Sequence, residues 1–116
     1  MRNLQEASRT SGNPINIEWS PFYLNDSSSL PSEGIDLPTY IKAKYGAETF
    51  KRYPELAAHL RKAGENVGIS FNDKRTIVGT DDAHRLMELV NSTYSHEIGG
   101  KLMFEMFKTY FEDAEN

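Results

Sequence analysis

The chain has 116 residues, a formal net charge of −4 and no cysteine. This length fits one small domain, and its acidic balance argues against nucleic-acid binding, which needs a basic surface. The absence of cysteine excludes disulfides, thiolate catalysis and thiolate metal sites. Because no apolar run forms a secretory signal or is long enough to span a bilayer, we expect a cytoplasmic protein without membrane contact.

The first 25 residues predict a short helix followed by a strand. Residues 1–8 have weak helical character. In INIEWS, residues 15–20, apolar and polar side chains alternate with the period of a strand that has one buried face. That face would be formed by Ile15, Ile17 and Trp19.

A serine- and proline-rich loop leads into two predicted helices. Asp36 is suited to cap the first helix, with Pro38 in its first turn, and Gly46 would close it. The second helix carries an apolar face at helical spacing. Pro54 should kink or restart this helix, and Gly64 should end it.

Two further helices are predicted in the last third of the chain. The first begins at Thr80 or Asp81, within GTDDAHRLMEL, and carries a narrow apolar stripe. The second runs from about Ser95 to Ala114 and has a wider stripe. A short extended piece is expected before them, at residues 69–71.

The charged residues that open the third helix allow two interpretations. As a helix start, Asp81 lies where the helix dipole favours negative charge and stands four residues before Arg85, the favourable order for an ion pair. As a site, Asp81, His84 and Glu88 share one helical face, but a single helix supplies few convergent metal ligands. We therefore favour a helix start and expect no metal, no other cofactor and no catalytic residue.

The stretch WSPFYLN, which leaves the predicted strand, also allows two interpretations. Its rings can be part of a core, or the strand end can face a cleft in which Asn25 offers its amide to a ligand, as at the strand ends of open α/β sheets. Both interpretations stay open on the residues alone.

A single strand raises a physical problem, because its backbone groups need partners and even a hairpin is marginal in water. Either the strand pairs with another chain, or the sequence belongs to a larger domain whose sheet lies elsewhere. We therefore expect self-association through Ile15, Ile17 and Trp19, or mobility of residues 1–23.

Several stretches together resemble one family: IEWSPFYLN, LPSEGIDLPTYIKAKYG, KAGENVGISF, GTDDAHRLMELV and FEMFKTYF. In order and spacing they are similar to the DsbA-like thioredoxin-fold oxidoreductases of the FrnE type. The 2-hydroxychromene-2-carboxylate isomerases and the kappa-class glutathione transferases are more distantly similar. The resemblance extends from about residue 2 to the C-terminus.

The resemblance implies a mainly α fold with one or two strands, namely part of a DsbA-like thioredoxin fold (α/β) and its helical insertion subdomain. Residues 1–25 match a helix end and a strand of the thioredoxin core, and residues 34–116 match the helical insertion. The Cys-x-x-Cys motif of the family would lie before the position that matches residue 1. We therefore expect a truncated, cysteine-free member of the thiol-disulfide oxidoreductase class without redox activity of its own. A non-catalytic helical binding or interaction module is the alternative.

The resemblance also selects the candidate site residues. In the family, the positions of Pro21, Phe22, Asn25, His84 and Arg85 border or support the cleft. A protein or peptide thiol is the substrate implied for the full-length family. For His84 and Arg85, a structural role at the helix start stays open.

Overall fold

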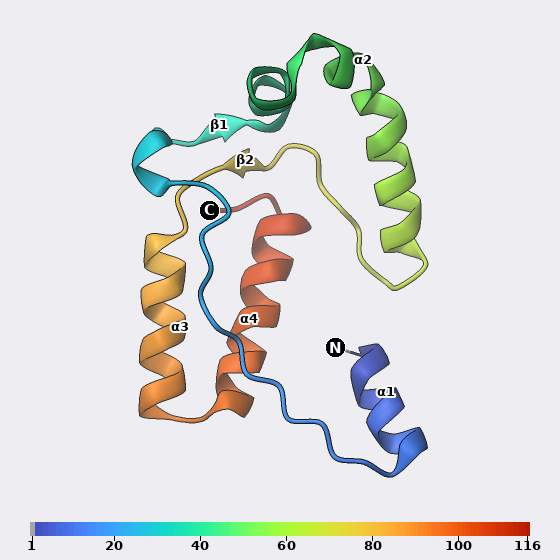
Figure 1. The fold of residues 1–116 in the computed structure, drawn as a ribbon, viewed down its shortest axis with the longest axis vertical. Coiled ribbons are helices and arrows are strands. Elements are labelled where there is room, and N and C mark those ends of the chain that lie inside the picture. The colour runs from blue at the N-terminus through green and yellow to red at the C-terminus, as the bar shows by residue number, and fades with distance from the viewer. Residues whose placement is uncertain (1) are drawn as a thin grey trace.

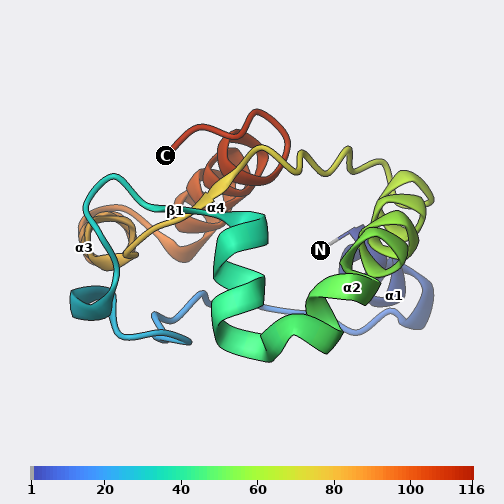
Figure 2. The same cartoon turned by 90° about the horizontal axis from the view of Figure 1, so that it is seen from above.

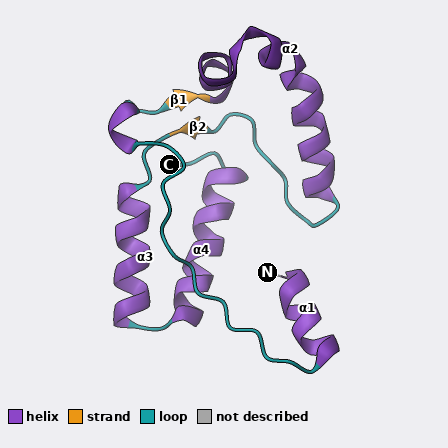
Figure 3. Ribbon diagram, viewed as in Figure 1, coloured by secondary structure: helices purple, strands orange, loops and turns teal. Residues whose placement is uncertain are grey.

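The computed structural model describes residues 2–116, which form a mainly helical fold with a two-stranded sheet (Figure 1). The elements in chain order are α1 (Arg2–Ser11), the 3-10 turn η1 (Ser27–Ser29), β1 (Ile35–Asp36), α2 (Leu37–Glu65), β2 (Thr76–Ile77), α3 (Asp81–Thr93) and α4 (His96–Phe111). The mainly α class expected from the sequence is confirmed, and loops connect most of the elements (Figure 3).

The strand predicted at residues 15–20 was wrong. This segment is irregular and runs past α3 and α4 (Figure 1), and within the described residues its backbone makes no hydrogen bond to another backbone group. No strand of residues 2–116 lies beside it to complete a ladder. Trp19 is partly buried, and its ring meets that of Phe107 edge-on at 5.5 Å between centroids. The alternating pattern therefore does not form a sheet in this segment, and its Trp19 packs against helix α4.

The sheet that does form is minimal and lies elsewhere in the chain. β1 and β2 pair antiparallel, with Ile35 opposite Ile77 and Asp36 opposite Thr76. Residues 69–71, expected to include an extended piece, form no strand, and β2 lies several residues further on. The sheet joins the start of α2 to the segment that leads into α3, so it fixes the positions of two helix N-termini.

The start of α2 agrees with the capping prediction. The Asp36 carboxylate accepts a hydrogen bond of 3.0 Å from the Thr39 backbone N–H. The Thr39 side chain and this backbone bond together lower the pKa of Asp36. The helix consists of two arms that run in different directions (Figure 2), because Gly46 has φ 84° and ψ 172°. The expected break at Gly46 is therefore present, whereas the backbone angles at Pro54 stay helical.

α3 and α4 form a helical hairpin, seen side by side in Figure 1. α3 begins at Asp81 and α4 follows Ser95, whose hydroxyl accepts a hydrogen bond of 3.2 Å from the Ile98 N–H. Met87 of α3 is 3% exposed, and Gly99 in the first turns of α4 is buried. The absence of a side chain at Gly99 allows the two helices to approach closely.

The core is small for a chain of this length. Among the described residues, the buried apolar side chains are those of Leu37, Ala57 and Met87. The accessible surface is 8670 Å², whereas a compact monomer of this mass exposes about 6,400 Å². The radius of gyration is 16.5 Å, against about 13.4 Å for a compact domain. Much apolar surface therefore stays open to solvent.

None of the helices in residues 2–116 combines the length and the apolar character that crossing a membrane requires.

Candidate functional site

Residues 19–27, which we call the anchored loop, contain three of the five candidate site residues. Both ends of this loop are tied to the region of α3. The Asn91 side-chain amide donates a hydrogen bond of 3.2 Å to the Trp19 carbonyl, and the Thr80 backbone N–H donates one of 3.3 Å to the Ser27 hydroxyl. The path of the loop is therefore set by α3 and its N-terminal residues.

A tyrosine in the middle of the loop contacts the acid and the histidine of the helix start. The Tyr23 hydroxyl donates a hydrogen bond of 2.6 Å to Asp81 Oδ1, and this bond raises the pKa of Tyr23. The Tyr23 ring lies edge-on to the His84 imidazole, at 4.6 Å between centroids. Asp81 and His84 thus belong to one cluster with a loop side chain. In this cluster the carboxylate serves as an acceptor for the tyrosine.

The next anchor connects the loop to the first arm of α2. Asn25 Oδ1 accepts hydrogen bonds from the Tyr40 hydroxyl at 2.8 Å and from Lys44 Nζ at 2.7 Å. Lys44 Nζ also donates to the Tyr40 oxygen at 2.8 Å, and this contact raises the pKa of Lys44. The amide oxygen of Asn25 is therefore bound by two side chains of α2. This does not support the interpretation in which the Asn25 oxygen binds a ligand in a cleft.

Three apolar side chains in the middle of the loop are open to solvent. Phe22 is 75% exposed and Leu24 is 84% exposed, and Pro21 is also exposed. Trp19 packs against Phe107 at one end of the loop, and hydrogen bonds hold the rest, while Phe22 and Leu24 face water. Exposed apolar groups gathered at one place are typical of an interaction site.

The other two candidates, His84 and Arg85, lie in different surroundings. His84 packs against the loop, and its Nδ1 atom is buried without a hydrogen-bond partner among the described residues. Arg85 instead pairs with Asp82 at 2.7 Å, with both side chains largely exposed. An exposed pair of this kind contributes little to stability. Arg85 therefore lies beside the cluster as a surface residue.

Sequence reasoning missed several side chains that anchor the loop, among them Tyr23, which donates to Asp81, and Lys44, which donates to Asn25. Tyr23 stands inside the motif WSPFYLN, which was the only available signal, and nothing in the spacing of the lysines singles out Lys44. Across residues 2–116, no group of three or more histidine, aspartate or glutamate side chains is arranged to hold a metal ion.

Searches against protein-family models, curated proteins and solved structures found no match. The resemblance to the DsbA/FrnE-like family thus rests on the motifs of the sequence.

Proposed function

We propose that the chain is a non-catalytic polypeptide-binding member of the DsbA/FrnE-like class, and that its binding element is the anchored loop. The observation that carries the proposal is the exposure of Phe22 and Leu24, at 75% and 84%, on a loop held by hydrogen bonds to α2 and to α3. An anchored loop loses little conformational entropy when a partner covers it, which favours binding. An apolar segment of an unfolded polypeptide is the partner that fits these side chains.

The absence of cysteine limits what the chain itself can contribute to such a function. Thiol–disulfide exchange proceeds through a thiolate, and this chain has no cysteine. In this proposal the chain contributes binding, and any dithiol that acts on a bound substrate belongs to another polypeptide. The proposal includes the cytoplasmic location expected from the sequence.

A binding module outside the redox class is the second candidate, and it is favoured by the same exposed side chains. The two candidate functions differ in whether a Cys-x-x-Cys motif belongs to the same protein as the binding element. An in-frame Cys-x-x-Cys encoded upstream of residue 1 supports the redox class, whereas its absence supports the independent module.

We expect the purified chain to show no thiol-disulfide oxidoreductase activity. The reason is the absence of a thiol group that could attack a disulfide. The measurement is the reduction of insulin by dithiothreitol, with thioredoxin as the positive control and buffer as the blank. Turnover above the blank contradicts the expectation.

We expect Phe22→Asp and Leu24→Asp each to weaken binding of an unfolded polypeptide by at least about tenfold, because each places a charge in the apolar contact. The probe is fluorescently labelled, reduced and carboxymethylated lactalbumin, followed by anisotropy. Leu89→Asp is the matched control, since Leu89 is 59% exposed on α3, outside the loop. Equal affinities for the parent chain and all three variants contradict the proposed role of the loop.

A further inference from the structure

A second apolar surface extends from the inner side of the two arms of α2 to α4. Two adjoining grooves, with volumes of about 330 Å³ and about 620 Å³, share Leu60 and Arg75 in their walls. The large apolar side chains of these walls that stay between 37% and 46% exposed form a surface that we call the groove face: Leu56, Leu60, Ile69, Phe104 and Phe107. Neither Phe22 nor Leu24 lines these grooves, so the groove face is distinct from the exposed part of the anchored loop.

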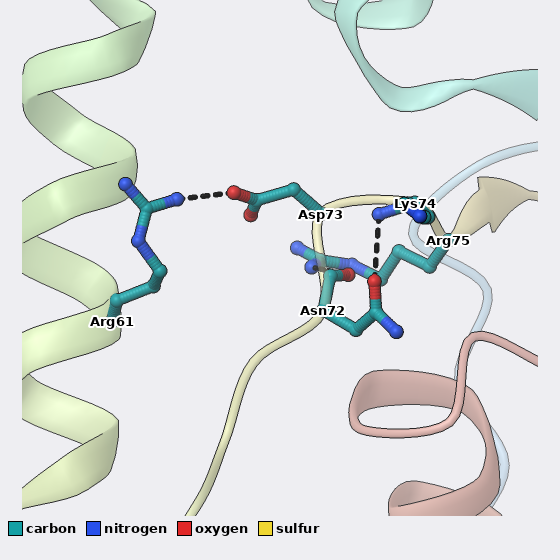
Figure 4. Close-up of polar contacts among 5 residues, drawn as sticks. All are labelled: Arg61, Asn72, Asp73, Lys74 and Arg75. Carbon is teal, nitrogen blue, oxygen red and sulfur yellow. Dashed lines mark hydrogen bonds and ion pairs between the residues drawn. The ribbon is translucent and has the colours of Figure 1, made fainter.

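The floor of the groove is held in place by polar contacts. Arg61 of α2 forms an ion pair with Asp73 of the segment that leads to β2 (Figure 4). In the same segment, the Asn72 N–H donates a hydrogen bond of 2.7 Å to the Phe111 carbonyl at the end of α4. The Arg75 guanidinium lies over the Phe111 ring, at 5.5 Å from its centroid. These contacts join both walls of the groove, so its shape belongs to the fold.

The amount of exposed surface matches what an interface between two copies requires. The chain exposes 8670 Å², about 2,300 Å² more than a compact monomer of its mass. Part of this excess belongs to α1, which stands apart from the other helices (Figure 1). The whole excess is more than twice the roughly 800 Å² that each partner buries in a stable interface of standard size.

The charges around the groove allow a copy to face itself. A two-fold interface places the same patch on both partners, so a patch of a single sign would repel its own copy. The groove walls carry both signs, with Arg75 and Lys108 against Glu105 and Glu112. Each positive side chain can therefore lie opposite an acid of the second copy.

We propose that the groove face binds the groove face of a second copy of this chain and forms a two-fold dimer. In the dimer, Leu60 and Phe104 of each copy are covered by apolar side chains of the other. This proposal is independent of the proposed function, because it concerns a different surface. A dimer presents two anchored loops, which strengthens binding to a polypeptide that carries two apolar segments.

The test is sedimentation equilibrium of the full chain over a range of concentrations. The expected result is a mass that rises with concentration from 13.2 kDa to twice that value. Leu60→Glu and Phe104→Glu should each raise the dimer dissociation constant by at least about tenfold, because each glutamate enters the interface twice. Leu89→Glu, on the exposed side of α3, is the matched control and should leave the constant unchanged.

Amide exchange of the parent chain provides a second measurement that does not depend on the folding of any variant. Protection of residues 102–108 should increase with protein concentration. A chain that stays monomeric at every concentration overturns the proposal, and so does exchange that is independent of concentration. Dimers lost in Ile17→Lys but retained in both groove variants also overturn it, because they would place the contact at residues 15–19.

Discussion

Replacing Met87 with alanine is expected to lower the free energy of unfolding by about 2–5 kcal/mol, the usual cost of truncating a buried methionine. Met87 is 3% exposed, the lowest value among the three buried apolar side chains of the described residues. It lies in α3, close to the buried Gly99 of α4. Domains of this size are stable by only about 5–15 kcal/mol. Because the core is so small, the substitution removes a large share of the total free energy of unfolding. Urea unfolding followed by circular dichroism measures the loss.

Leu89→Ala is the matched control for this experiment. Leu89 lies on the same helix but is 59% exposed, so its truncation should change the stability by no more than about 0.5 kcal/mol. Equal unfolding midpoints for the two variants would mean that Met87 is not enclosed between α3 and α4.

The starts of α2, α3 and α4 could be predicted because their signals are local, whereas α4 ends at Phe111 and not at the predicted Ala114. Asp36 accepts the Thr39 N–H at a distance of three residues, and Ser95 does the same for Ile98. The break at Gly46 is equally local, because its φ of 84° is a conformation that glycine adopts without cost. Such features depend on neighbouring residues, so the sequence is sufficient to place them.

The strands could not be predicted, because pairing depends on a partner far along the chain. INIEWS has the alternation of a strand, yet no second strand of the described residues reaches it, and Trp19 packs against Phe107 instead. β1 and β2 have two residues each, too few for any period to be visible. Their pairing needs Gly34, where φ is +82° and a Cβ atom would lie 2.6 Å from Val78.

In the candidate site, too, features set by neighbouring residues could be predicted, whereas contacts between distant residues could not. The sequence placed Asp81, His84 and Glu88 on one helical face, as helix geometry requires. It could not show that Tyr23, 58 residues before Asp81, supplies the hydrogen bond to that carboxylate. Asn25 was a candidate both from its place after the predicted strand and from the resemblance. Its partners on α2 became visible only when the chain was folded.

Replacing Gly99 with alanine is expected to destabilise the chain by about 1–3 kcal/mol. Helix propensity alone predicts the opposite, because alanine inside a helix is favoured over glycine by up to about 1 kcal/mol. A Cβ atom at residue 99, however, would collide with Oδ1 of Asn91. Moving the Asn91 side chain would also break its hydrogen bond to the Trp19 carbonyl, which adds about 0.5–1.5 kcal/mol. The collision therefore outweighs the propensity.

A double-mutant cycle separates these two effects. In an Asn91→Ala background the obstacle to the Cβ atom is gone, so Gly99→Ala should be neutral or stabilising there. The two substitutions should thus be coupled by about 1–3 kcal/mol, with the second relieving the effect of the first. Thermal and urea unfolding of the parent chain, both single variants and the double variant measure this coupling. If Gly99→Ala stabilises the chain in both backgrounds, α4 does not approach α3 closely enough at this point for Asn91 to anchor the loop.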